Sequence, residues 1–300
     1  MTHTPVLLNE TLALLAVNEG GRYVDGTLGR AGHTSAIIAQ GGEVLGIDRD
    51  DQALAEVAQK KIERLHALKG RHGDILEITR GWGWNEVDGV LLDLGVSSPQ
   101  LDEASRGFSF MHDGPLDMRM DTSCGVTAAE IVNNESEAVL VETFRELGEE
   151  NRASAIARAI IKRRAQKEFA TTLELADVVE KISPRRSGKH PATKVFQALR
   201  MAVNDELNEL RRALSGALEL LKSGGRLAVI TFESITDREV KRFFASHVGR
   251  EVSLQQGGSE WQGELPRVRL VVKRAVQATG EEVDLNIRSR SAKLRVVEKM

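Results

Sequence analysis

Cysteine is almost missing from the sequence, with Cys124 as the single example among 300 residues. One thiol cannot form an internal disulfide or a cysteine-cluster metal site, and we expect Cys124 to be buried and inert. Long apolar runs are also missing, and residues 1–10 lack the basic and apolar regions of a targeting segment. These absences predict a soluble, cytoplasmic protein with no metal site and no membrane partner.

Aromatic residues make up only 4% of the chain, which disfavours extensive stacking on nucleic-acid bases. The net charge of −3 argues against a general polycation, but the charge is unevenly distributed. Between Arg152 and Arg200 there are 12 Lys or Arg residues and 4 Asp or Glu residues. This basic stretch is either a solvated helix face or a surface that contacts the phosphates of a nucleic acid.

Short apolar runs alternate with amphipathic stretches at both ends of the chain. The runs predict strands over residues 22–25, 44–47, 87–92 and 226–232, a third strand or its edge over residues 69–73, and terminal strand candidates over residues 268–273 and 294–297. Strands that alternate with helices favour an α/β fold with a parallel sheet. In the middle of the chain the periodicity predicts helices alone, over residues 127–133, 135–147, 152–166 and 172–182, and one long helix follows over residues 196–221.

The stretch from Val87 to Gln100 changes character abruptly. Val90 to Leu92 form the continuous apolar run of a buried parallel strand, and a polar loop begins at Asp93. Because open α/β sheets bind ligands beyond the carboxyl ends of their strands, this loop is a candidate ligand site. An ordinary strand-to-loop turn with solvated hydroxyls remains the alternative.

A glycine-rich loop runs from Gly26 to His33 after the first predicted strand, and Asp48 follows the second strand, 22 positions beyond Gly26. An acid at about this spacing accepts hydrogen bonds from ribose hydroxyls in nucleotide-binding folds. The glycine spacing differs from the dinucleotide fingerprint, so a nicotinamide or flavin cofactor is disfavoured. The loop therefore indicates either nucleoside binding or a plain βαβ turn, in which His33 would only hydrogen-bond the turn.

Several long segments resemble one family closely. They are residues Asp25–Thr27 with Gly29–Arg30 and Gly32–His33, Asp93–Asp102, Arg106–Met111, Asp113–Met120, and His190–Thr193 with Phe196–Arg200. In these segments, which are spread over nearly the whole chain, the sequence resembles the bacterial S-adenosylmethionine-dependent methyltransferases that modify the N4 of cytidine 1402 in 16S ribosomal RNA.

The resemblance implies a class I, Rossmann-like α/β methyltransferase sheet with an inserted all-helical domain after the fourth strand. It implies an S-adenosylmethionine-dependent methyltransferase domain over residues 1–103 and 201–300. The inserted helical domain, over residues 104–200, would face the RNA. The implied partner is 16S rRNA within the small ribosomal subunit, and the oligomeric state stays open, with a homodimer among the possibilities.

The resemblance also implies which residues contact the cofactor, S-adenosylmethionine. By position these are Gly29, Ala31, Gly32, His33, Asp48, Ile75, Asp93 and Gln100. The family usually has a glycine where this chain has Ala31 and an aromatic residue where it has Ile75, so these two contacts differ in detail. Glu233 and Thr236 stand where a histidine and an acid are usual, and we assign Glu233 no obligatory proton transfer.

Methylation of a cytosine amino group is favoured by hydrogen-bond acceptors aimed at the amino hydrogens, because the nitrogen must become pyramidal before it attacks. We interpret Asp93, Ser97, Ser98 and Pro99 as the catalytic segment. The target base must also leave its stack. The residues expected to bind the base and the RNA around it are Asp117, Arg119, Arg163, Lys189, His190, Arg290 and Ser291.

Three other functions compete with this prediction. An amino-methyltransferase that acts on DNA would need the same phosphate contacts, which carry no information about the sugar. A catalytically silent regulator that binds S-adenosylmethionine would share the donor pocket. A nicotinamide-dependent oxidoreductase is supported only by analogy of fold.

Overall fold

The computed structural model describes residues 5–184, 188, 190–253, 259–262 and 266–300. The chain folds into two compact units. We call Met1–Gly95 together with Asn208–Met300 the sheet unit, and Val96–Leu207 the helical unit. The helical unit thus extends beyond residues 104–200 at both of its ends.

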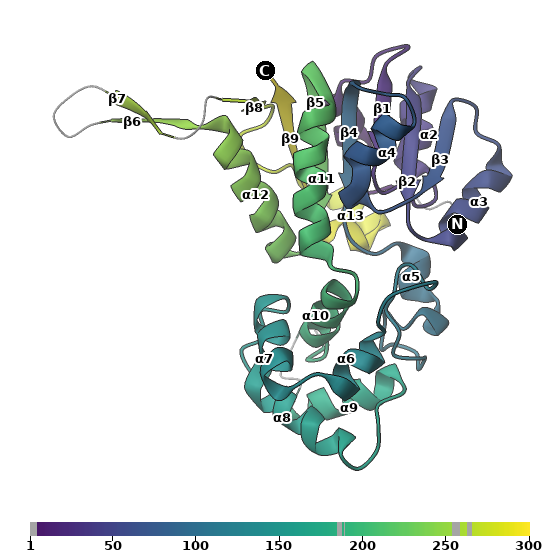
Figure 1. The fold of residues 1–300 in the computed structure, drawn as a ribbon, viewed down its shortest axis with the longest axis vertical. Helices are drawn as coiled ribbons and strands as arrows, with labels where there is room; N and C mark the ends of the chain where they lie inside the picture. Colours follow the sequence, from purple (N-terminus) through teal and green to yellow (C-terminus); the bar gives the residue numbers. More distant parts are fainter. Residues whose placement is uncertain (1–4, 185–187, 189, 254–258, 263–265) are drawn as a thin grey trace. The chain divides into compact units, whose positions relative to one another are not determined.

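The sheet unit is built on a seven-stranded sheet (Figure 1). In spatial order its strands are β3 (Leu65–Lys69), β2 (Glu43–Asp48), β1 (Arg22–Asp25), β4 (Val87–Asp93), β5 (Leu221–Thr231), β9 (Lys293–Lys299) and β8 (Val268–Leu270). The first five are parallel, and β9 pairs antiparallel with both β5 and β8. This arrangement confirms the predicted α/β class with a Rossmann-like sheet.

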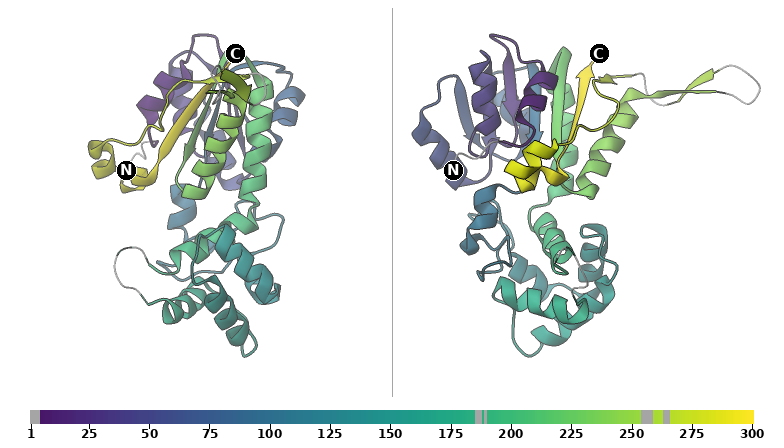
Figure 2. Two further views of the ribbon diagram at one scale, coloured as in Figure 1. Left: turned by 90° about the vertical axis from the view of Figure 1, so that its left-hand side faces the viewer. Right: turned by 180° about the vertical axis from the view of Figure 1, so that it is seen from behind.

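Helices cover both faces of this sheet (Figure 2). They are α1 (Leu8–Leu15), α2 (Gly32–Ala39), α3 (Asp51–Lys60), α4 (Ile75–Gly81), α11 (Glu206–Leu220) and α12 (Ser234–Val248). The short helix α13 (Gly280–Leu285) buries none of its residues. Side chains alternate along β4, so that Val90 and Leu92 pack in the core under α11, whereas Leu91 packs in the core under α1 and α2. Each such side chain stabilises the fold by about 1.5–3 kcal/mol on burial. A strand buried on both faces explains the continuous apolar run.

The third strand was predicted over residues 69–73, and this prediction was wrong. The strand is Leu65–Lys69, and its parallel ladder with β2 ends where the Gly70 N–H donates to the Asp48 carbonyl. The chain then turns into a 3₁₀ helix, within which the buried carboxylate of Glu209 accepts the Gly73 N–H at 3.0 Å. The strand thus ends with its partner, because the last pair of the ladder, Asp48 with Lys69, is also the end of β2.

The single helix predicted over residues 196–221 was also wrong. The chain forms α10 (Thr193–Val203) and then α11, with Asn204 and Asp205 between them. Asp205 adopts a left-handed φ of 52°, which interrupts the helix. Asn204 instead uses its side chain to bond backbone groups of the segment around Met118.

The helical unit has its own core, which includes Phe144, Ile156, Phe169 and Leu199. Its helices are α5 (Ser98–Asp102), α6 (Ala128–Asn134), α7 (Glu137–Glu146), α8 (Ala153–Arg164), α9 (Thr172–Ile182) and α10. Polar residues cap four of them, and Thr127 and Thr171 each form a capping box with a glutamate three residues later. Residues 103–126 are irregular apart from a 3₁₀ turn and an isolated β-bridge at Pro115.

A two-stranded antiparallel ribbon follows α12 and was not predicted. It pairs β6 (Arg250–Ser253) with β7 (Ser259–Gln262), and in Figure 1 it extends away from the main sheet. In the part of the chain that the structure describes, no helix has the length and apolarity needed to cross a membrane.

Candidate functional site

The glycine-rich loop at the carboxyl end of β1 is held by the buried carboxylate of Asp25. That carboxylate accepts hydrogen bonds from the Thr34 hydroxyl at 2.7 Å and from the Thr27 N–H at 3.1 Å. Burial raises its pKa, although these donors oppose the change. The Thr27 hydroxyl oxygen also accepts the Asp93 N–H at 2.6 Å, which ties the end of β4 to the same loop.

Two residues of the loop, Gly29 and Ala31, adopt left-handed backbone conformations with φ of 49° and 61°. Glycine adopts this conformation without steric cost, whereas alanine does so at a cost of about 1–2 kcal/mol. Gly26 is required for another reason, because a Cβ there would lie 2.6 Å from Leu92 Cδ2. The loop backbone is therefore packed directly on the core.

Asp48 lies at the carboxyl end of β2 and organises this loop. One carboxylate oxygen accepts the Gly29 N–H at 2.7 Å and the other accepts the Asp50 N–H at 2.9 Å. Burial raises the pKa of Asp48, while the two backbone donors act in the opposite direction. A carboxylate has about four acceptor positions, so Asp48 can accept hydroxyls of a ligand in addition to these two bonds.

His33 and Asp93 meet beside this loop. The His33 Nε2 atom lies 3.0 Å from the Val6 carbonyl, which can only accept, so Nε2 carries a proton. The other ring nitrogen, Nδ1, faces Asp93 Oδ2 at 3.6 Å, an ion-pair distance rather than a hydrogen bond. Burial raises the pKa of Asp93 to about 6, with His33 opposing the rise and Asp25 adding to it. The structure thus brings together two predicted site residues, an imidazole and a buried carboxyl group.

Ile75 and Gln100 have clear structural roles. Ile75 is completely buried, and it packs close to Gly26 in the core of the sheet unit, so its predicted contact with the cofactor stays a prediction. In the helical unit, Gln100 Oε1 accepts the Ser97 N–H at 3.0 Å, and Ser97 Oγ accepts the Gln100 N–H at 3.4 Å. The two form a capping box at the start of α5, and Pro99 lies in the first turn. The Ser-x-x-Gln pattern was the sequence signal for this box.

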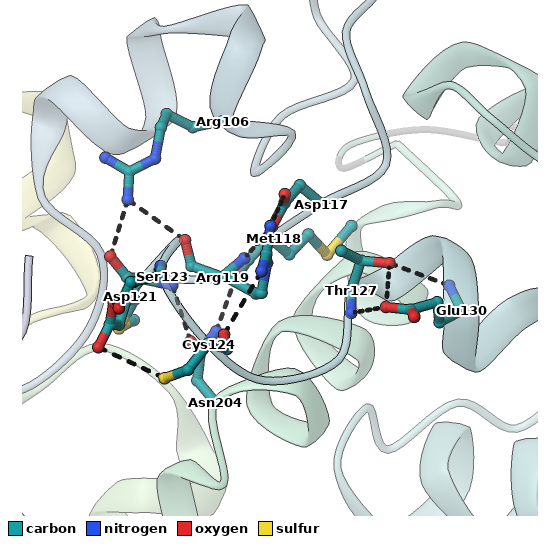
Figure 3. A network of polar contacts seen from close by, with 11 residues as sticks. Arg106, Asp117, Met118, Arg119, Asp121, Ser123, Cys124, Thr127, Glu130 and Asn204 are labelled. Atoms are coloured by element: carbon teal, nitrogen blue, oxygen red, sulfur yellow. Dashed lines mark hydrogen bonds and ion pairs between the residues drawn. The ribbon is translucent and has the colours of Figure 1, made fainter.

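Asp117 and Arg119 form a two-pronged ion pair in the helical unit (Figure 3). Arg119 Nε donates to Asp117 Oδ1 and Arg119 Nη2 donates to Asp117 Oδ2, both at 2.8 Å. Burial alone would raise the pKa of Asp117, but the bonds and charge of Arg119 hold it below its usual value. Both side chains remain about one fifth exposed, so the pair is accessible as a preformed donor and acceptor.

Sequence reasoning missed the residues that hold this pair in place. Asn204 Nδ2 donates to the Met118 carbonyl at 2.8 Å, and Asn204 Oδ1 accepts the Met120 N–H at 2.9 Å. Arg106 Nη2 donates to the carbonyls of Arg119 and Met120, at 3.2 and 3.0 Å (Figure 3). The Asn-Asp pair after a helical run is a helix-stop signal, and it was the available clue to Asn204.

Two residues of the basic stretch that are predicted to contact RNA also have partners within the protein. Arg163 pairs with Glu174 at 3.1 Å and lies over the ring of Phe169 at 4.4 Å. His190 Nδ1 accepts the Ala192 N–H at 3.1 Å, and its ring stacks on Phe110. Lys189 lies outside the described residues.

Three predictions concern residues elsewhere. Arg290 and Ser291 are exposed on a 3₁₀ helix of the sheet unit, so they belong to a different unit from the other expected RNA contacts. The prediction that Cys124 is buried was wrong, because it lies in an irregular polar loop where its thiol is exposed. Within the described ranges no group of three or more His, Cys, Asp or Glu side chains is arranged to hold a metal ion.

Comparison with known proteins was made for the whole chain. The model of the MraW methylase family matches residues 1–300. The ribosomal RNA small subunit methyltransferase H of Parvibaculum lavamentivorans is 48% identical, over 99% of this chain and 89% of that protein. The protein of the same name from Carboxydothermus hydrogenoformans is 46% identical, over 100% and 98%. A solved structure of a putative methyltransferase from Streptococcus mutans, in complex with SAH, is 13% identical, covers 100% of both chains and has a TM-score of 0.43.

Proposed function

The chain belongs to the MraW methylase family, and we propose that it transfers a methyl group from S-adenosylmethionine to the N4 amino group of cytidine 1402 in 16S rRNA of the small ribosomal subunit. The full-length similarity to ribosomal RNA small subunit methyltransferases supports the choice of substrate. The observation that carries the proposal is the loop formed by Gly26 to His33 with Asp48, because it fits a nucleoside at the carboxyl edge of the sheet.

The donor pocket is assigned to the sheet unit. Asp48 has acceptor positions for ribose hydroxyls, and Gly29 lets the backbone approach a ligand closely. S-adenosylmethionine, when bound, supplies a methyl group on a positively charged sulfur. The residues around it have only to bind it and to align the methyl carbon with the acceptor nitrogen, which is a proximity effect.

Asp93 is the residue that we assign to the amino group. In the transfer a carbon–nitrogen bond forms as the carbon–sulfur bond breaks, and the amino nitrogen then carries an extra proton. An ionised Asp93 carboxylate accepts a hydrogen bond from the amino group, which favours the pyramidal nitrogen, and then takes the released proton. A positive charge on His33, whose Nδ1 lies 3.6 Å from Asp93 Oδ2, favours the ionised form of Asp93. Ser97 and Ser98 are assigned as further acceptors for the amino hydrogens.

The Asp117–Arg119 pair is assigned to the base that leaves the stack. Cytosine has an amino donor beside two acceptors, the ring N3 and the O2, along its pairing edge. The guanidinium of Arg119, held by the Asp117 carboxylate, offers several donors to these two acceptors, while the amino group is left to Asp93. Uracil has an N3–H donor where cytosine has the N3 acceptor, so the donors of Arg119 favour cytosine.

The test is the transfer of a labelled methyl group from S-adenosylmethionine to three acceptors: small ribosomal subunits, free 16S rRNA and duplex DNA. We expect label in ribosomal RNA, at the N4 of one cytidine that is mapped by digestion and mass spectrometry. Preferred labelling of DNA would support the DNA methyltransferase instead. Donor binding in calorimetry without transfer to any RNA would support the non-catalytic regulator.

A further inference from the structure

A strained residue lies between the two members of the Asp117–Arg119 pair. Met118 is completely buried and adopts a φ of 65°, in the left-handed region. For a residue with a side chain this conformation costs about 1–3 kcal/mol, and it persists only where the surroundings enforce it. The conformation makes the side chains of Asp117 and Arg119 meet, although they are only two positions apart.

Asn204 helps to hold Met118 in this left-handed conformation. It is 4% exposed, and its amide bridges the chain on both sides of Arg119, through the Met118 carbonyl and the Met120 N–H. A further bond from Asn204 Nδ2 to the Arg200 carbonyl, at 2.9 Å, fixes the amide to the end of α10. Arg200 is fixed in turn by a two-pronged ion pair with Glu206, at 2.7 and 2.8 Å.

The remaining backbone groups of this segment are bonded as well. The Met118 N–H donates to the Arg106 carbonyl at 3.1 Å, and the Ala128 N–H donates to the Asp117 carbonyl at 2.8 Å. Together with the hydrogen bonds from the Arg106 side chain, these bonds hold the backbone of residues 117–120 in a single conformation. The guanidinium of Arg119 is thereby presented in one orientation.

We propose that Asn204 is a positioning residue for RNA binding: through the left-handed Met118 it holds the Asp117–Arg119 pair in the orientation that contacts the base. This inference rests on the proposed function, because it needs a nucleic-acid base at Asp117 and Arg119. It also explains why the helical run from residue 193 to 220 is broken at Asn204, where an unbroken helix would point the amide elsewhere. Preorganisation of this kind lowers the ordering cost of binding.

The main variant is Asn204→Asp, which keeps the size of the side chain. It replaces the Nδ2 donor with an oxygen that faces the carbonyls of Met118 and Arg200, and so removes two hydrogen bonds. We expect the KM for the ribosomal RNA substrate to rise about tenfold. We expect the dissociation constant for S-adenosylmethionine, measured by calorimetry, to change less than about twofold.

The chain offers a matched control in Asn133→Asp. Asn133 makes the same kind of bridge, with Nδ2 donating to the Phe169 carbonyl at 2.8 Å and Oδ1 accepting the Phe169 N–H at 2.9 Å. Its loss should lower the melting temperature as the Asn204 variant does, but leave the KM for RNA unchanged. Equal rises in KM for both variants would show a merely structural role and overturn the proposal.

A double-mutant cycle with Arg119→Ala tests the route of the effect. If Asn204 acts through Arg119, the double variant has the same KM for RNA as Arg119→Ala alone, whereas independent effects would multiply and overturn the proposal. If Asn204→Asp does not fold, Asn204→Ser replaces it in the same cycle. A wild-type protein without methyl transfer to RNA would refute the proposed function, whereas an active wild type with an unchanged KM in the Asn204 variant refutes this inference alone.

Discussion

Replacement of Asp48 by alanine tests the donor pocket most directly. The change removes the acceptor for the Gly29 N–H at 2.7 Å and for the Asp50 N–H at 2.9 Å. Hydrogen bonds to a charged group contribute about 1.5–3 kcal/mol each, and the left-handed Gly29 would lose the bond that fixes it. The proposed ribose contact is lost as well. A net loss of about 2–3 kcal/mol predicts that S-adenosylmethionine binds about 30- to 150-fold more weakly.

The assay is isothermal calorimetry with S-adenosylmethionine, at a temperature well below the melting point of each variant. The affinity of Asp48→Asn for S-adenosylmethionine should lie between those of the wild type and Asp48→Ala, because the one amide oxygen can accept only some of the hydrogen bonds that the carboxylate accepts. Asp51→Ala is the matched control, since Asp51 is 64% exposed and pairs only across the surface with Lys69. A dissociation constant for Asp48→Ala within about threefold of the wild-type value would refute the assignment of this loop as the donor pocket.

Three further predictions concern the catalytic pair, the support of the loops and the hydroxyls. Methyl transfer should fall as the pH drops below about 6, because burial raises the pKa of Asp93 to about 6 and protonation removes the accepting carboxylate; a rate that is constant down to pH values of about 5 would contradict this. Glu209→Ala should lower the free energy of unfolding in urea by about 2–3 kcal/mol, because the buried Gly73 N–H loses its acceptor. The control is Glu219→Ala, because Glu219 forms a half-exposed ion pair with Arg80; this variant should change the free energy of unfolding by less than about 0.5 kcal/mol. If Glu209→Ala also changed the free energy of unfolding by no more than this, the buried contact would not stabilise the fold. Ser97→Ala combined with Ser98→Ala should slow methyl transfer and leave donor affinity nearly intact, at a capping cost of about 1 kcal/mol, and a fully active double variant would exclude the hydroxyls from catalysis.

Much of the sheet unit followed from patterns that neighbouring residues carry. The first strand was predicted with the bounds that the structure shows, Arg22–Asp25, and Val90 to Leu92 were predicted to be buried. Apolar runs indicate burial, and glycines indicate turns, from a few neighbouring residues alone. These patterns can therefore be interpreted without any knowledge of the tertiary structure. The same is true of α9, whose bounds match the predicted range of residues 172–182.

Predictions failed where a distant residue competes with local preference. Nothing near residues 69–73 shows that the ladder with β2 ends at Lys69 or that Glu209 accepts the Gly73 N–H. Arg163 is expected at phosphates because it lies in a basic stretch; the structure adds Glu174 and the ring of Phe169 as partners within the fold, and its contact with RNA stays a prediction. The sequence shows that a residue is charged, but it does not show which residue pairs with that charge in the folded protein.

The sequence by itself determined the kind of protein: an α/β sheet, a glycine loop with an acid beyond it, and a set of segments that resembles one methyltransferase family. The tertiary structure decided how the site residues are held. Asp117 and Arg119 join as one pair, Asn204 supports them from 86 positions beyond Met118, and His33 faces Asp93 with its other nitrogen fixed by Val6. The physical reason is that periodicity encodes burial along the chain, whereas a hydrogen bond between remote residues depends on coordinates that only the packed core fixes.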